Sequence, residues 1–190
     1  MRPALNAPRN ASVPLDLPLP EFRTPRLRLR ALTPADAPAI QGHIAERQLA
    51  EGTRSIPHPA PPDAASGFIA RSLAPAREED VWAILGPVAG SEALLGLIAL
   101  KPLDRGQSQI GYWVGRDHRN SGIASEAVRL IVAANPHGAR TLFAEVFQDN
   151  PASARVLTQA GFDFIGDAEA ISVARGGVKV PTWTYLRRMG

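Results

Sequence analysis

A turn between an apolar strand-like run and a helical pattern constrains this chain more than any other stretch. Residues 119–124 read Arg-Asn-Ser-Gly-Ile-Ala, directly after the run at 110–114, and apolar residues at helical spacing continue to Ala134. The first N–H groups of such a helix lack internal partners and carry partial positive charge. Because Gly122 permits close approach and Arg119 adds a cationic fork, the turn predicts a phosphate site.

A second strand and helix follow this unit. Residues 141–147 are rich in β-branched and aromatic side chains, which is typical of a buried strand. Asn150 suits a helix N-cap, Pro151 suits the first helical position, and Gly161 suits a left-handed exit. The pattern predicts a short helix between Asn150 and Gly161.

The remaining elements alternate along the chain, so the fold class is α/β or α+β with a mixed sheet. Residues 1–20 are proline-rich and predict a flexible tail, which leaves one domain at 21–190. Strands are predicted around Leu27 and Leu29 and at 81–85, 94–100 and 110–114; helices are predicted from Thr33 to about 50, at 64–73 and at 123–134; a loop is predicted at 52–63, and a β-hairpin at 168–174 and 178–186. On the third of these helices the expected core face comprises Ile123, Ala127, Leu130, Ile131 and Ala134.

Composition excludes several classes of function. The chain has no cysteine, which rules out disulfides, thiolate nucleophiles and cysteine metal sites. The net charge of +3 comes from scattered basic residues, so direct nucleic-acid binding is not expected. With no apolar run of roughly 20 residues and no secretory pattern, we expect a soluble, cytoplasmic protein that does not enter membranes.

Two longer runs carry a family resemblance. The run IGYWVGRDHRNSGIASEA, followed by EVFQDNPASARVLTQAGF, resembles the cofactor-binding core of the GNAT superfamily of acetyl-CoA dependent N-acetyltransferases. The segments TPRLRLRALTPADA and IPHP are similar to its RimJ and RimL type branch of ribosomal-protein N-terminal acetyltransferases. Together these signals cover residues 24 to about 188. The resemblance implies a splayed central sheet with helices on both faces and a C-terminal hairpin.

The resemblance also implies how acetyl-CoA is held. The strands ending at Val114 and near Gln148 should run parallel and separate to admit the pantetheine arm. The turn should hold the pyrophosphate, while Asn150 should contact the pantetheine or only cap its helix. The expected cofactor-binding residues are Tyr112, Trp113, Val114, Arg119, Asn120, Ser121, Gly122, Ile123, Ala124, Asn150 and Ser153.

The implied chemistry is direct attack of an amine on the thioester, without a metal. A backbone N–H near Val114, at a bulge in that strand, should polarise the carbonyl. Leu157 stands where many relatives have the tyrosine that protonates the departing thiolate, so Ser153 is the expected proton donor. Gln159 replaces a lysine that is common in the family.

The general base is less clearly marked. Glu46, Glu51 and His58 lie in the segment expected to shape the acceptor pocket, and Glu145 is a secondary candidate within a strand. An α-amine is far more often neutral at pH 7 than a lysine side chain, a difference worth about 3.5 kcal/mol. A weak base therefore favours an α-amine acceptor.

The expected function is acetyl transfer from acetyl-CoA to a primary amine. The acceptor would be a ribosomal or other protein N-terminus, a peptide or a small amine. The oligomeric state stays open, with a homodimer, common among relatives, as one alternative. Two alternatives stay open. The missing tyrosine favours a CoA-binding module without catalysis, and the arginine-bearing first strand favours an RNA-binding or ribosome-binding protein.

Overall fold

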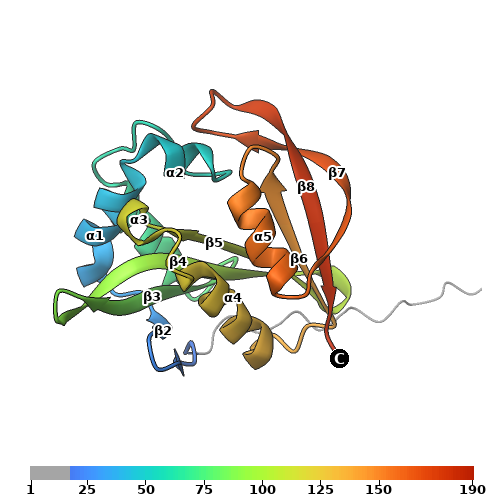
Figure 1. Ribbon diagram of the computed structural model, residues 1–190. Helices are drawn as coiled ribbons and strands as arrows, with labels where there is room; N and C mark the ends of the chain where they lie inside the picture. The colour runs from blue at the N-terminus through green and yellow to red at the C-terminus, as the bar shows by residue number, and fades with distance from the viewer. Residues whose placement is uncertain (1–17) are drawn as a thin grey trace, which may run out of the picture.

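One open sheet organises the chain, and the computed structural model describes it for residues 18–190 (Figure 1). Most of the predicted tail therefore lies outside the described residues. The sheet has eight strands in the order β1-β2-β3-β4-β5-β6-β8-β7. Neighbouring strands of the sheet are antiparallel, except for β5 and β6, which are parallel. This arrangement confirms the mixed sheet predicted from the sequence.

The element bounds agree closely with the sequence pattern. The strands are β1 (Phe22–Arg23), β2 (Arg28–Ala31), β3 (Asp80–Val88), β4 (Ser91–Leu103), β5 (Gln107–Val114), β6 (Thr141–Phe147), β7 (Asp163–Ser172) and β8 (Val178–Arg188). The α-helices are α1 (Ala37–Ile44), α2 (Arg47–Glu51), α3 (Ala64–Ser72), α4 (Ile123–Ala134) and α5 (Pro151–Gln159). The C-terminal hairpin is confirmed, with β7 starting five residues earlier than predicted.

The predicted helix from Thr33 to about residue 50 is divided. A short 3-10 turn at Pro34–Asp36 leads into α1, and the chain leaves helical geometry at Glu46 (φ −73°, ψ 121°) before α2 begins. The carboxylate of Glu46 is bound at this break by Arg119, a residue far away in sequence. The interruption coincides with a tertiary ion pair that the local pattern does not contain.

Helices cover both faces of the sheet, and each face has its own core. The helices α4 and α5 pack on one face, around Trp82, Ile98 and Leu157. On the other face α1, α2 and α3 enclose the second core, around Ile40 and Leu97. The core face predicted for α4 is correct only in part: Ala127 and Ile131 are buried as expected, Val128 and Val132 are buried as well, and Ala134 is exposed.

The parallel pair β5 and β6 is joined over a short distance. Three residue pairs connect the strands, from Gln107 with Thr141 to Gln109 with Phe143. Beyond these pairs β5 stays with β4, whereas β6 stays with β8 over its whole length (Figure 1). The two strands therefore diverge as expected, and the sheet opens between residues 110–114 and 144–147.

Gly96 allows β4 and β5 to approach closely beside this opening. A Cβ at Gly96 would lie 2.2 Å from the carbonyl oxygen of Trp113 and 3.0 Å from Cα of Val114. Both neighbours are backbone atoms, so they cannot move without displacing the strand.

We expect Gly96→Ala to lower the free energy of unfolding by about 1 to 3 kcal/mol, because overpacking would force β5 away from β4. Urea unfolding measures this effect. The matched control is Gly111→Ala on β5, where a Cβ would meet nothing within 4 Å. Equal stability of the two variants would contradict the close approach.

Arg30 and Asp36 fix the start of α1 against β2. Two Arg30 guanidinium nitrogens donate to the two Asp36 carboxylate oxygens at 2.8 Å each, and the Thr33 N–H donates to Oδ2 at 2.7 Å. Burial raises the pKa of Asp36, but these donors outweigh it and hold the pKa below its ordinary value. The charged form of Asp36 is therefore the stabilising one.

We expect Asp36→Asn to cost about 2 kcal/mol of stability at neutral pH, because charged hydrogen bonds are lost. Since the folded pKa is depressed, this stabilisation is present above the ordinary carboxyl pKa and is lost as pH falls through the folded value. Urea unfolding of both proteins between pH 7 and pH 2 should therefore show the two curves converging. Glu92→Gln, which breaks an exposed pair with Arg28, is the control with a much smaller effect.

Candidate active site

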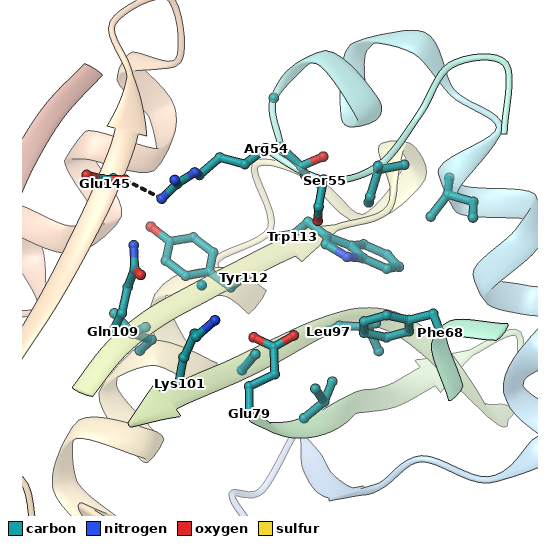
Figure 2. Close-up of a pocket in the computed structure, with 18 of the residues that line it drawn as sticks. Arg54, Ser55, Phe68, Glu79, Leu97, Lys101, Gln109, Tyr112, Trp113 and Glu145 are labelled. Carbon is teal, nitrogen blue, oxygen red and sulfur yellow. Dashed lines mark hydrogen bonds and ion pairs between the residues drawn. The ribbon is translucent and has the colours of Figure 1, made fainter. Parts of the chain in front are cut away.

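The divergence of β5 and β6 opens into a cavity of about 980 Å³ (Figure 2). Its walls come from β4, β5, β6, α3, α5 and the loop that follows α2. The labelled side chains include aromatic residues on one side, at Phe68 and Trp113, and charged residues on the other, at Arg54 and Glu145 (Figure 2). The cavity has the size and mixed lining of a small-molecule site.

The backbone of β5 borders this cavity, and its pairing decides which groups face it. The Gly115 N–H donates to the Leu95 carbonyl at 2.8 Å. Because antiparallel strands bond through alternate residues, Trp113 also directs its backbone groups toward β4, while those of Tyr112 and Val114 point into the gap. The backbone groups of Trp113 are therefore engaged with β4, and the cofactor contacts expected from Tyr112 and Val114 stay predictions.

The bulge expected near Val114 is also displaced. The pairing of β4 with β5 is regular from Leu103 and Gln107 to Gly96 and Val114. The register shift instead lies between β3 and β4, where Leu95 is the extra residue. The β-bulge therefore lies in β4, next to β5. Leu95, the extra residue of the bulge, still contacts β5, because its carbonyl accepts the Gly115 N–H.

The turn at residues 119–124 has the geometry of an anion site. Asn120 and Gly122 are left-handed, with φ of +58° and +80°, and α4 begins at Ile123. The Ser121 hydroxyl donates to the His118 carbonyl, which fixes the turn internally. The N–H groups at the start of α4, including that of Ala124, have no partner within the helix and carry the positive end of its dipole.

Two arginines approach this turn, and only one of them was expected there. Arg119 is bound by the carboxylate of Glu46, with nitrogen to oxygen distances of 3.1 and 2.5 Å. Arg26 donates to the Ser121 carbonyl at 3.4 Å and to Glu126 at 2.9 Å. Arg26 is more than ninety residues away in sequence, and no local signal marks it.

The start of α5 faces the opposite side of the gap. The Asn150 side chain accepts the Ser153 N–H at 3.2 Å, so the predicted cap is present. The Ser153 hydroxyl donates to Oη of Tyr112 at 2.9 Å, and Tyr112 donates to the Ser153 carbonyl at 3.0 Å. Burial raises the pKa of Tyr112 far above its ordinary value, partly opposed by Ser153, and keeps the phenol protonated. Leu157 is fully buried in the core.

The carboxylates considered as a base are mostly engaged. Arg54 donates to Glu145 at 2.6 Å (Figure 2), and Glu46 is held by Arg119. Glu51 lies 3.4 Å from Arg47 across one helical turn.

His58 and Glu79 differ from these three. Nδ1 of His58 is buried without a hydrogen bond in the described part of the chain, and His58 is not among the residues that line the cavity. Glu79 lines the cavity and was missed, because two glutamates before a strand resemble an ordinary solvated end.

Arg175, in the turn between β7 and β8, bridges the far end of the cleft. It donates to the Glu51 carbonyl at 2.9 and 3.1 Å and to Asp149 at 2.6 Å, and it lies over the Phe147 ring. The Val173 N–H donates to the Arg54 carbonyl at 3.0 Å. The hairpin is thereby tied to the segment that follows α2.

A second polar group, Ser108, His137 and Asp80, resembles a hydrolytic triad in composition. His137 lies 2.9 Å from the Ser108 hydroxyl and 3.1 Å from Asp80. Ser108 is fully buried and lies outside the cavity, so the group ties strands together and does not reach a substrate. Within residues 18–190, no set of three His, Asp or Glu side chains is arranged to hold a metal.

The chain is similar to known proteins in sequence and in fold. Residues 26–163 match the family model described as "Acetyltransferase (GNAT) domain". "Probable N-acetyltransferase YjcK" of Bacillus subtilis (strain 168) is 36% identical over 97 residues, which is 48% of this chain and 50% of that protein. The match thus spans half the length of that curated relative.

Two solved structures share the fold. The microcin C7 self-immunity acetyltransferase MccE, in complex with acetyl-CoA and AMP, gives a TM-score of 0.75 at 15% identity, covering 87% of this chain and 93% of that one. The ribosomal L7/L12 acetyltransferase RimL, in complex with coenzyme A, gives a TM-score of 0.74 at 16% identity, covering 90% of this chain and 98% of that one.

In the described residues, no helix has the length and hydropathy needed to cross a membrane.

The bond between Ser153 and Tyr112 is open to a direct test. We expect Tyr112→Phe to cost about 1 to 2 kcal/mol of stability, because the Ser153 hydroxyl loses its acceptor in a partly buried place. Ser153→Ala should cost less, since Tyr112 keeps its bond to the Ser153 carbonyl. A double-mutant cycle by urea unfolding should give a coupling of about 0.5 to 1.5 kcal/mol, and additive effects would refute the bond.

Proposed function

Since the chain belongs to the GNAT acetyltransferase family, we propose that it transfers an acetyl group from acetyl-CoA to a primary amine by direct attack. The observation that carries this proposal is the gap between β5 and β6, which adjoins the amide-lined turn at the start of α4. MccE and RimL, which share the fold, are described in complex with acetyl-CoA and with coenzyme A. The catalytic domain is proposed to comprise residues 21–190.

The cofactor would lie along the gap with its pyrophosphate at the turn. The N–H groups at Gly122, Ile123 and Ala124 supply donors to the anion, and Arg26, which is paired with Glu126, lies beside them. Arg119 would contribute to phosphate binding only if its guanidinium left Glu46 and paired with the phosphate. The pantetheine amides would pair with the outward backbone groups of Tyr112, as an added strand does, which leaves the N–H of Val114 for the thioester.

The chemistry then follows from groups already in place. The amine nitrogen attacks the thioester carbonyl carbon, and the outward N–H of Val114 stabilises the oxyanion that forms. As the carbon–sulfur bond breaks, the Ser153 hydroxyl turns from Tyr112 and gives its proton to the thiolate. The attacking amine loses one proton as it becomes an amide, and this proton returns to the Ser153 oxygen, so that no alkoxide remains. Tyr112, whose oxygen lies 2.9 Å from that of Ser153, orients the hydroxyl between turnovers.

We propose an α-amine of a peptide or protein, including a ribosomal one, or a small amine as acceptor. Glu145 and Glu46 are ion-paired with arginines and are therefore less available as bases. A weakly assisted reaction favours an amine that is already partly neutral at pH 7, as an α-amine is. The described relative RimL acts on a protein α-amine.

A protein that binds CoA without turnover is the second candidate. It is favoured by the same ion pairs, which occupy two of the expected bases. No observation of the site favours the RNA-binding hypothesis.

Cellular location and assembly belong to the same proposal. We propose a cytoplasmic enzyme, because acetyl-CoA and ribosomal acceptors are available there. For the homodimer, the best surface is the outer edge of the hairpin, where Phe164, Ile165, Ile171 and Val178 are more than half exposed. Apolar side chains on an edge strand are typical of a surface that pairs with another chain.

The test is release of free thiol from acetyl-CoA in the presence of a panel of peptides and small amines. We expect turnover, and we expect Gly122→Val to raise the KM for acetyl-CoA at least about tenfold, because the Cβ occupies the anion approach and strains a positive φ. Gly90→Val in the hairpin between β3 and β4 has a similar φ, +84°, and should leave the KM unchanged.

Two other results have clear meanings. Tight CoA binding by calorimetry, without acetyl transfer to any amine, would favour the second candidate. An unchanged affinity for CoA in Gly122→Val would refute the phosphate site at this turn.

A further inference from the structure

We propose that Glu79 forms an ammonium-binding subsite with the aromatic and apolar wall of Phe68, Leu97 and Trp113. This inference rests on the proposed function, because it names the charge state and shape of the acceptor that the cavity receives. The subsite would select a primary ammonium carried on an apolar group.

The sheet register places Glu79 at the acceptor side of the cavity. Asp80 pairs with Leu100 and Val81 with Ala99, so Glu79 lies beside Lys101 at the end of β3. Residues that alternate along a strand share a face, which puts Glu79 on the face of Val81 and away from α4 and α5. Figure 2 shows its carboxylate directed into the cavity, between Lys101 and the ring of Phe68.

The opposite wall of the subsite is apolar and aromatic. Leu97 pairs with Trp113, so these side chains share one face of neighbouring strands, and Phe68 reaches them from α3. An ammonium group beside aromatic faces gains a cation–π attraction, which is larger where water is excluded. The wall therefore accepts the apolar body of an amine and favours its charge.

The cations nearest to Glu79 and Glu145 are bound to other carboxylates or to Glu145 itself, and Lys101 acts on Glu79 only at a distance. Lys101 is bound by Glu78 at 2.9 Å, and Arg54 is bound by Glu145 at 2.6 Å. Glu79 has no hydrogen bond or ion pair to any residue in the described part of the chain. Of the two lining carboxylates without an ion pair in the described residues, Asp63 is exposed, whereas Glu79 is half-buried and beside the aromatic wall, where a bound cation would neutralise it.

Burial adds a driving force for cation binding. Desolvation raises the pKa of Glu79, Lys101 opposes this rise, and Glu78 adds to it. A carboxylate that is destabilised in this way gains more from an ammonium partner than a fully hydrated one does. Arg71, a second cation of the lining, lies on α3 and is exposed to solvent, which screens its charge.

The experiment is a calorimetric titration of 2-phenylethylammonium chloride at pH 7, repeated with uncharged 2-phenylethanol. We expect the native protein to bind the ammonium more tightly than the alcohol. Glu79→Gln should weaken ammonium binding at least about tenfold and leave the alcohol unchanged, because only the charge partner is removed. Glu169→Gln is the control, since its carboxylate lies on β7 outside the cavity and is 59% exposed, and this variant should bind both probes like the native protein.

A third variant, Glu79→Asp, guards against a general disturbance of the wall. It retains a carboxylate and should keep part of the preference for the ammonium, whereas a packing defect would affect both probes in every Glu79 variant. Native-like ammonium binding by Glu79→Gln would overturn the proposal. So would a native protein that binds the alcohol as tightly as the ammonium.

The titration is performed with and without saturating coenzyme A, so that two failures are separated. If coenzyme A does not bind, the proposed function fails, yet the titration without it still reports on Glu79. If coenzyme A binds and the charge preference is absent, the subsite fails while the cofactor site stands.

Discussion

The divergence of two parallel strands is the constraint on which the site depends. After three residue pairs, β5 and β6 can no longer satisfy each other's backbone groups. Polar groups at such an opening need partners, and the outward groups of Tyr112 and Val114 offer a strand edge inside the molecule. The absence of a Cβ at Gly96 lets β5 stay paired with β4 as far as Val114, so the opening forms on the side of β6.

Features coded by neighbouring residues were predicted well. The short helix α5 has its cap at Asn150 and its left-handed exit at Gly161, and the strand before it has the predicted bounds. Such features depend on backbone preferences that act within one turn, so a single sequence contains them. The turn before α4 belongs to the same class, because Gly122 there has a positive φ.

The partners of charged side chains could not be predicted from the neighbouring residues. Arg119 was expected to face an anion, but it binds Glu46 at the break between α1 and α2. Arg26, the hydroxyl of Tyr112 and the carboxylate of Glu79 all enter the site through contacts between distant segments. The partner of a charged side chain depends on distances between atoms in the folded structure. The hydrophobic periodicity of the sequence contains no information about these distances.

Arg175 gives the cleft a closed outline. The sheet joins the two halves of the molecule at one end, and Arg175 joins them again through Glu51 and Asp149 at the other. A cleft that is closed at both ends in this way admits a narrow ligand more easily than a wide one. For the proposed acceptor, this outline favours a chain terminus or a slender molecule that enters lengthwise over an amine that projects from a broad folded surface.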